Sequence, residues 1–397
     1  MTRPLLISYG GGHANIIIAL AQELTRRGTA FYLIGLTTAF AAFERAGLNP
    51  LDVTALADHA DDARAFAQVQ RYLPDHHHPD ITSAQTRAYF ALGFADLARR
   101  LGEGEAHRRT AASGRKAFEP VSIFTRYFVR HRPSILVATT APRFELAAIR
   151  AARRCGVVTL AVGDHFLVGE SSAICSGDYA DHLVVLAEAV ATRLRSTGGA
   201  LPQMHVLGNP AFDALALLPG DAERRTDLRA RMGIGGAKLL FWPLGGAARS
   251  GSGEPLLTAG EAAAILDPIT GGGDWRYILR AHPNWPVAHD LPQMCPPGFS
   301  PKDCLLACDL VVAESTTLGL QALLRGIPVI AFGHADLTQY PHFGWASLAR
   351  SAEELRALIL SGNYARPPSE LAELVGTAAA RVTDLIERLS APKAAAA

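Results

Sequence analysis

The sequence predicts an α/β protein made of two doubly wound domains, and three observations lead to this prediction. Short apolar segments of strand length alternate with segments of helical period along most of the chain. Glycine-rich turns follow several of the expected strands, as in parallel sheets whose loops bind ligands. The 397 residues, 49% of them hydrophobic, suffice for two packed cores of ordinary size.

The first half of the chain begins with a β-α-β-α pattern. An apolar strand is expected at 4–9 (PLLISY), and a helix follows the glycine run at 14–27. The other elements expected here are strands at 30–36, 134–139, 157–162, 181–186 and 204–207, and helices at 38–46, 142–155 and 187–196. Together they predict a Rossmann-like domain over residues 1–216, interrupted by an Ala- and Arg-rich helical insert at about 52–119.

A second alternation of the same kind follows a charged stretch that contains several glycines. This stretch, residues 217–236, is expected to be the linker between the domains. Strands at 239–242, 277–280, 310–313 and 328–332 then predict a second Rossmann-like domain over 237–375. The periodic segment at 371–389 predicts an amphipathic helix, so residues 376–397 are assigned to a C-terminal helix and tail.

Charge and cysteine content exclude several classes of protein. Lys and Arg number 38 against 37 Asp and Glu, so a nucleic-acid binder that works through a basic excess is excluded. Five cysteines without a CxxC pair suggest neither a disulfide framework nor a zinc site. The chain begins without a signal-peptide pattern and has no apolar run near ~18 residues, which predicts a soluble, cytoplasmic protein.

The first candidate site lies in the loops that follow strands of the first domain. Gly11 and Gly12 would let a ligand approach the backbone at a helix start, and the imidazole of His13 can accept a hydroxyl proton near neutral pH. The spacing is neither GxGxxG nor a P-loop, and the alternative is a glycine turn with a solvent-exposed histidine. Asp164 and His165 follow another strand as either a catalytic or a structural pair.

Two more residues of this domain are candidates because they follow the strand at 134–139. Arg143 suits a phosphate or a sugar carboxylate, and Glu145 suits either ligand binding or capping of the next helix.

The second candidate site lies in the corresponding loops of the second domain. A glycine loop with Arg249 suits a diphosphate, although a mobile surface loop is the alternative. Three hydroxyl residues then open a helix, which is more donors than an N-cap needs. The candidate ligand-binding residues of this domain are Gly245, Gly246, Arg280, His282, Glu314, Ser315, Thr316, Thr317 and Gln321.

Several of these segments resemble the GT-B glycosyltransferase superfamily. His13 behind a glycine run and before ANIIIALAQELTRRG resembles the opening of the peptidoglycan N-acetylglucosaminyltransferase group, and GLQALLRGIPVIAF (319–332) is similar to its C-terminal helix and strand. The segments at 180–194 and 206–215 also resemble UDP-N-acetylglucosamine 2-epimerases and CDP-glycerol transferases. RAHPNW (280–285) is similar to the HP element of those two groups.

The resemblance covers most of the chain outside the insert, and it implies two Rossmann-like domains that face each other across a cleft. It implies His13 or the Asp164/His165 pair as the base, with Gly11, Gly12, Arg143 and Glu145 on the acceptor side. It assigns the nucleotide-sugar donor to the second-domain candidates, with Gln321 where many members carry a ribose-binding Glu. It implies no cofactor and no essential metal.

The function expected from this resemblance is a metal-independent inverting glycosyltransferase. It would move a sugar from a nucleoside-diphosphate sugar such as a UDP-sugar to a hydroxyl of a saccharide or lipid-linked acceptor, in bacterial cell-surface polysaccharide or glycolipid synthesis. One alternative is a UDP-N-acetylhexosamine 2-epimerase or hydrolase, and another is a non-catalytic sugar-nucleotide binder. The aromatic and basic segment at 118–131 is expected to be an amphipathic core helix, with peripheral membrane contact as its alternative.

Overall fold

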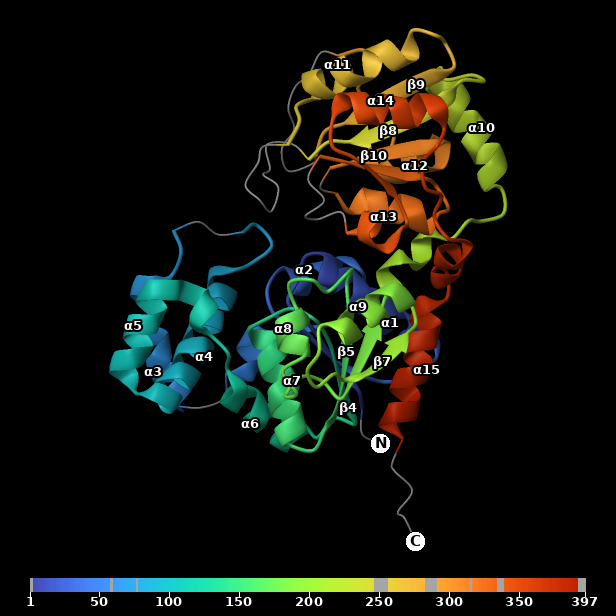
Figure 1. The fold of residues 1–397 in the computed structure, drawn as a ribbon. Coiled ribbons are helices and arrows are strands. Elements are labelled where there is room, and N and C mark those ends of the chain that lie inside the picture. Colours follow the sequence, from blue (N-terminus) through green and yellow to red (C-terminus); the bar gives the residue numbers. More distant parts are fainter. Residues whose placement is uncertain are drawn as a thin grey trace. The chain divides into compact units, whose positions relative to one another are not determined.

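A computed structural model of the chain describes residues 3–57, 60–75, 78–245, 256–282, 291–314, 316–333 and 339–391. The chain forms two compact units (Figure 1). Unit 1 comprises Met1–Asp213 together with Thr377–Ala397, and unit 2 comprises Ala214–Gly376. Each unit contains one parallel sheet surrounded by helices, which confirms the prediction of two Rossmann-like domains.

The sheet of unit 1 has seven strands in the order β3-β2-β1-β4-β5-β6-β7, and all neighbouring pairs are parallel. The strands are β1 (Leu5–Ser8), β2 (Tyr32–Gly35), β3 (Leu51–Asp52), β4 (Ile135–Thr139), β5 (Val158–Val162), β6 (His182–Val185) and β7 (Gln203–Val206). The strand order reverses between β1 and β4. Ligands of doubly wound sheets bind at the carboxyl ends of the strands beside such a reversal.

Most helices of unit 1 connect these strands, and α3, α4 and α5 form a separate group beside the sheet (Figure 1). The helices are α1 (Gly12–Arg26), α2 (Thr38–Arg45), α3 (Ala60–Gln68), α4 (Ser83–Leu101), α5 (Glu103–Ser113), α6 (Val121–His131), α7 (Phe144–Arg154), α8 (Ser171–Ile174), α9 (Glu188–Ser196) and α15 (Ala378–Ser390). The group lies within the segment expected as the insert. Tyr89 of α4 stacks on Phe144 of α7, with ring centroids 3.9 Å apart, and thereby fixes the group to the sheet edge.

The core of unit 1 is completed by the last helix of the chain, which lies against α1 (Figure 1). Val382, Leu385 and Ile386 of α15 belong to the same buried cluster as Leu6 of β1 and Ile17 of α1. Arg27 reinforces this packing through ion pairs with two carboxylates of α15. The helix begins later than the expected residue 371, because Gly376 has φ +87° and the chain changes units there.

The sheet of unit 2 has five parallel strands in the order β12-β11-β10-β8-β9. They are β8 (Lys238–Pro243), β9 (Trp275–Arg280), β10 (Leu310–Ala313), β11 (Val329–Phe332) and β12 (Ser347–Ala349). The helices are α10 (Asp221–Arg231), α11 (Ala259–Thr270), α12 (Pro301–Ala307), α13 (Thr317–Leu324) and α14 (Ala352–Ser361). The strand order reverses between β8 and β10, so the loops after these two strands lie at the switch point of this unit.

The stretch expected as a linker, residues 217–236, lies within unit 2 and contains the helix α10. Arg225 and Arg229 of α10 both form ion pairs with Asp309, just before β10. The chain passes from unit 1 to unit 2 at residues 213–214, a few residues before this stretch.

The aromatic and basic segment at 118–131 forms α6, whose Val121, Ile123, Phe124, Tyr127 and Phe128 are buried in unit 1. These side chains are thus occupied by packing within the protein. Among the described residues, no helix is both long enough and apolar enough to cross a bilayer.

Candidate functional site

Three of the sequence-predicted residues of unit 1 meet at the carboxyl edge of its sheet. Asp164 follows β5, and its Oδ2 accepts a hydrogen bond from Nδ1 of His165 at 2.8 Å. Nε2 of His13, in the first turn of α1, lies 3.8 Å from the same oxygen. One carboxylate therefore stands between two imidazoles that are 152 residues apart in the chain. All three side chains are between 22% and 30% exposed, so a ligand can reach them.

The surroundings of Asp164 favour its ionised form. Burial by itself would raise the pKa of Asp164, but the hydrogen bond from His165 and the two imidazoles outweigh burial and hold that pKa below its ordinary value. Because an ionised carboxylate can only accept, Nδ1 of His165 carries a proton, and in the neutral form of the ring Nε2 is the nitrogen that has the lone pair. His165 is therefore oriented to act as a base through Nε2.

Two further groups complete the cluster. Asn209 donates from Nδ2 to the carbonyl oxygen of Asp164 and accepts from the backbone N–H of Ala211, which ties the β5 loop to the loop after β7. Glu170 lies within the field of Asp164 and of both imidazoles, and burial together with Asp164 raises the pKa of Glu170. The cluster thus holds an ionised carboxylate, a carboxyl that holds its proton more tightly than usual and two imidazoles, a set suited to proton transfer.

Glu145 has a different role from the predicted contact with an acceptor. Its side chain is completely buried, and its carboxylate accepts hydrogen bonds from the N–H of Tyr9 and from the N–H and hydroxyl of Thr139, at 2.5–2.6 Å. Burial raises the pKa of Glu145 to about 7, although these hydrogen bonds oppose the rise. Glu145 therefore joins the ends of β1 and β4 and has no exposed surface for a ligand. The sequence could not show that the N–H groups of Tyr9 and Thr139 donate to its carboxylate.

Arg143 stands beside this junction in an unusual backbone conformation. Its φ is +69°, and its guanidinium lies over the ring of Tyr9, 4.7 Å from the ring centroid. Gly11 and Gly12 are exposed, and a Cβ added to either would meet no atom within 4 Å. The space above the β1 loop is therefore open on the side where the sequence predicts a ligand.

In unit 2, Glu314 is the titratable residue at the switch point. It follows β10, is 6% exposed and accepts a hydrogen bond at Oε1 from the N–H of Leu257. Burial raises the pKa of Glu314 to about 7, a rise that the Leu257 N–H and the indole of Trp242 oppose. Neither Oε2 of Glu314 nor Nε1 of Trp242 makes a hydrogen bond of normal geometry within the described residues. One carboxylate oxygen of Glu314 is thus buried near the indole of Trp242 without a hydrogen bond of normal geometry among the described residues.

The other described candidates of unit 2 are placed by local structure. Thr316 caps α13, since its hydroxyl accepts from the N–H of Leu318, while Thr317 is exposed. Gln321 lies half-buried on α13. The guanidinium of Arg280 donates to the carbonyl oxygen of Phe299. A Cβ at Gly245 would lie 2.1 Å from Cδ1 of Leu256, so the Leu256 side chain packs directly against this glycine.

Several predicted residues lie outside the part of the chain that the structure describes. Gly246, Arg249, Ser315 and residues 283–285 are not among those that the structure describes, whereas His282, two residues after β9, is described and half-buried. In the part of the chain that is described, no group of three or more His, Cys, Asp or Glu side chains is placed to hold a metal ion. Metal-independent chemistry therefore stays a prediction.

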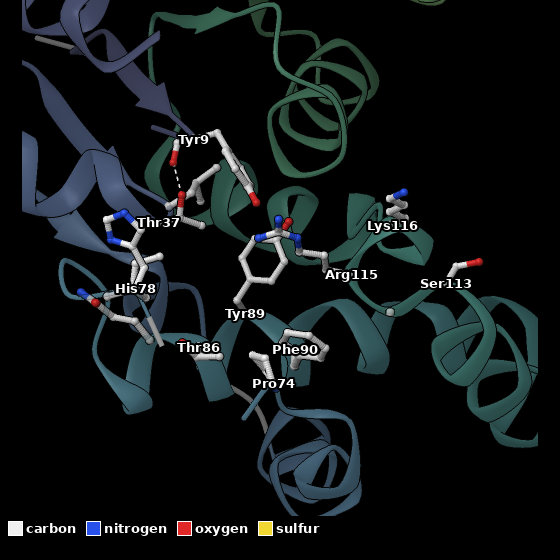
Figure 2. A pocket seen from close by; sticks show the side chains of 14 residues that line it. Tyr9, Thr37, Pro74, His78, Thr86, Tyr89, Phe90, Ser113, Arg115 and Lys116 are labelled. Atoms are coloured by element: carbon white, nitrogen blue, oxygen red, sulfur yellow. Dashed lines mark hydrogen bonds between the residues drawn. The ribbon is translucent and has the colours of Figure 1, made fainter. Parts of the chain in front are cut away.

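Sequence patterns missed a pocket of about 500 Å³ in unit 1, next to the glycine loop (Figure 2). It is lined by Tyr9, Leu36, Thr37, Pro74, His78, Ile81, Gln85, Thr86, Tyr89, Phe90, Ser113, Gly114, Arg115 and Lys116. Tyr9, directly before the glycine run, was the one available signal. The α4 and α5 residues carry no motif, and only their packing against the sheet edge brings them to this place.

Comparison with known proteins gives matches at the level of structure. No protein-family model matches the chain, and no curated protein sequence matches it. A UDP-GlcNAc 2-epimerase from Neisseria meningitidis bound to UDP-GlcNAc has a TM-score of 0.56 at 10% identity, over 97% of this chain and 100% of that one. A UDP-GlcNAc 2-epimerase from Methanocaldococcus jannaschii has a TM-score of 0.54 at 12% identity, over 97% and 99%. MurG from Acinetobacter baumannii has a TM-score of 0.53 at 12% identity, over 98% and 100%.

These likenesses confirm the fold, since they extend over both units of the chain. The solved neighbours belong to the GT-B group that the sequence motifs resemble, and they include both UDP-GlcNAc 2-epimerases and MurG. Identities of 10–12% support the fold alone, so the reaction has to be inferred from the residues of this chain.

Proposed function

We propose that this chain is an enzyme that acts on a UDP-N-acetylhexosamine, and that its reaction is 2-epimerisation or hydrolysis of the sugar nucleotide. The observation that supports this proposal is the Asp164 carboxylate between the imidazoles of His13 and His165 at the switch point of unit 1. UDP-GlcNAc 2-epimerases of the same fold are prominent among the solved neighbours. Their names favour the epimerase alternative over the glycosyltransferase expected from the sequence motifs.

The cluster has the groups that such a reaction requires. Inversion at C2 needs one group that accepts the C2 proton and another that returns a proton to the opposite face of the ring, whereas hydrolysis needs a base for water. His13 or His165 is assigned the role of base. Glu170, whose pKa is raised, is assigned the role of proton donor. Asp164 orients His165 and stabilises its imidazolium, in the way that a carboxylate supports a histidine base elsewhere.

Unit 2 is assigned the binding of the nucleotide. At its switch point α13 begins, and the first N–H groups of this helix suit a phosphate. The Oε2 atom of Glu314 lies at the same switch point and makes no hydrogen bond of normal geometry within the described residues. Residues 244–245 and 316–317 follow the two strands at which the order reverses. The predicted donor-side residues are therefore proposed to bind the diphosphate and the ribose.

Incubation with UDP-N-acetylglucosamine alone in D₂O tests the reaction. Epimerisation gives UDP-N-acetylmannosamine with deuterium at C2, and hydrolysis gives free UDP and a free sugar, both visible by NMR. His13→Ala, Asp164→Asn and His165→Ala should each lower turnover about 10²–10³-fold while UDP still binds. His182→Ala is the matched control, because His182 begins β6 at the opposite edge of the sheet. The proposal would be contradicted if UDP-N-acetylglucosamine stayed unchanged although the protein binds UDP.

A second candidate is transfer of the sugar to a hydroxyl acceptor, and the pocket at Tyr9 is the observation that favours it. The same histidine base would then take the proton from the acceptor hydroxyl instead of from water or C2. Release of UDP that occurs only when a saccharide or lipid-linked acceptor is added would support this candidate over the first.

A further inference from the structure

The pocket of unit 1 has a surplus of positive charge. Arg115 and Lys116 line it, and none of its 14 lining residues is acidic. Within the described residues, no carboxylate forms an ion pair with Arg115, Lys116 or the nearby Arg143, whereas most other arginines of this unit are paired. Examples are Arg45 with Asp80, Arg100 with Asp96 and Arg150 with Glu119. Arg115 and Lys116 are exposed at the rim of the pocket, and two cations at the mouth of one pocket favour an anionic ligand there.

The hydroxyls of two tyrosines, Tyr9 and Tyr89, lie beside the same space. Tyr89 is 4% exposed, and neither its hydroxyl nor that of Tyr9 makes a hydrogen bond of normal geometry within the described residues. Figure 2 shows both hydroxyls directed toward the side chain of Arg115. Burial raises the pKa of Tyr89 far above its usual range, although Arg143 and Arg115 oppose the rise, so the phenol remains a donor. Buried donors of this kind are normally satisfied, and here a ligand oxygen would satisfy them.

The floor of the pocket is aromatic and held in place. The ring of Tyr89 is stacked on Phe144, and the ring of Phe90 stands edge-on to Phe118 with centroids 5.4 Å apart. Tyr9 meets Tyr89 at 6.2 Å and an angle of 77°. Such a surface suits the C–H faces of a pyranose ring, and a volume of about 500 Å³ holds a ligand larger than a bare ion.

We infer that this pocket binds an anionic sugar, with its phosphate or carboxylate at Arg115 and Lys116 and its ring on Tyr89 and Phe90. The hydroxyls of Tyr9 and Tyr89 donate to oxygens of the ligand. This site goes beyond the proposed reaction, because neither epimerisation nor hydrolysis of a nucleotide sugar requires a second ligand in unit 1. In a transferase it would be the place of the acceptor, and in an epimerase or hydrolase it would be an effector site.

Calorimetric titration of the full chain with glucose 1-phosphate, glucuronate, glucose and decyl phosphate tests the inference, without any nucleotide sugar present. At least one of the two anionic sugars is expected to bind ten-fold or more tightly than glucose. Arg115→Ala/Lys116→Ala should weaken that binding by 10-fold or more. Arg108→Ala/Arg109→Ala is the matched control, since it removes two positive charges of α5 that are paired with Glu105. Equal affinity for glucose, binding of decyl phosphate alone, or no binding of either anionic sugar would overturn the inference.

Tyr89→Phe separates a binding role from a structural one. It removes a buried hydroxyl that lacks a partner and keeps the ring stacked on Phe144. The melting temperature of the free protein should stay the same or rise, while affinity for the anionic sugar falls several-fold. A lower melting temperature with unchanged affinity would show that the hydroxyl serves the fold, and would remove it from the site.

Failure of this inference can be distinguished from failure of the proposed reaction. Asp164→Asn should lower turnover of UDP-N-acetylglucosamine about 10²–10³-fold and leave binding of the anionic sugar to the pocket unchanged. If the pocket binds as expected and UDP-N-acetylglucosamine is never turned over, only the proposed reaction is lost.

Discussion

The two units each place a buried glutamate at the switch point of a parallel sheet, and the two carboxyls differ in what surrounds them. Glu145 of unit 1 is completely buried and receives three hydrogen bonds from Tyr9 and Thr139. Glu314 of unit 2 is 6% exposed and receives one such bond, from Leu257. Burial raises the pKa of both to about 7. The two glutamates thus share their residue type, their place in the sheet and a raised pKa. Glu145 links two strands, whereas Glu314 keeps one oxygen without a hydrogen bond of normal geometry among the described residues.

The difference teaches that a shifted pKa does not by itself identify a functional residue. In both units the shift comes first from burial, which is common to structural and functional carboxyls. The satisfied or unsatisfied state of the carboxylate oxygens distinguishes the two. Three predictions test this distinction.

The largest effect is expected for Glu145→Ala. It leaves the N–H groups of Tyr9 and Thr139 without an acceptor and should lower the free energy of unfolding by about 3 kcal/mol. Urea unfolding followed by far-UV circular dichroism measures this. Glu188→Ala is the control, because Glu188 also lies in the first turn of a helix but its side chain is 65% exposed. Equal losses for the two variants would show that the Glu145 link contributes little.

A smaller effect, and one on binding, is expected for Glu314→Ala. If Oε2 accepts a hydrogen bond from the nucleotide, its removal should weaken UDP binding about 10-fold. Calorimetric titration with UDP measures this, with Glu353→Ala, an exposed first-turn glutamate of α14, as the control. Unchanged affinity for UDP would remove Glu314 from the nucleotide site.

The most gradual effect, spread over more than two pH units, is a pH dependence of the stability of unit 2. The pKa of Glu314 is raised from its ordinary 4.5 to about 7, so between these pH values the folded state keeps a proton that the unfolded state has lost. Stability should therefore fall as pH rises through this window, by at most about 1.4 kcal/mol per pH unit, and level off above it. Glu314→Gln, which resembles the protonated form, should flatten this dependence.

Tryptophan fluorescence can isolate that measurement. Trp242, Trp275, Trp285 and Trp345 are all the tryptophans of the chain, and all belong to unit 2. Urea midpoints at pH 5 and pH 8 thus report on unit 2 alone. Parallel pH profiles for the wild type and Glu314→Gln would mean that the carboxyl titrates near its ordinary value.

The parts of the fold that depend on local sequence were predictable. Buried parallel strands read as continuous apolar runs, and LLIS and LVVA both form strands where expected. The sequence also placed His13 and Asp164 at the ligand edge of one parallel sheet, whereas their approach to 3.8 Å was not predicted. Residues that share a sheet edge are brought together by topology however far apart they lie in the chain.

The parts that depend on long-range packing were not predictable. The sequence around Glu145 is the same whether its carboxyl faces solvent or the N–H of Tyr9, and only the approach of β1 to β4 decides. The ion pairs of α10 could not be foreseen, because their partner, Asp309, lies some 80 residues away in the chain. Tyr89 and Arg115 join the pocket through the packing of α4 on α7, for which no sequence pattern exists.

The return of α15 to unit 1 has a consequence for synthesis of the chain. Val382, Leu385 and Ile386 complete a core whose other members are made first, so the N-terminal unit waits for the last helix to leave the ribosome. All of Ala214–Gly376 is translated in between, which takes roughly 10–30 s at the usual rate of elongation. During this interval the apolar face that α15 covers stays open to chaperones, and the second unit has its whole sequence available before the first one does.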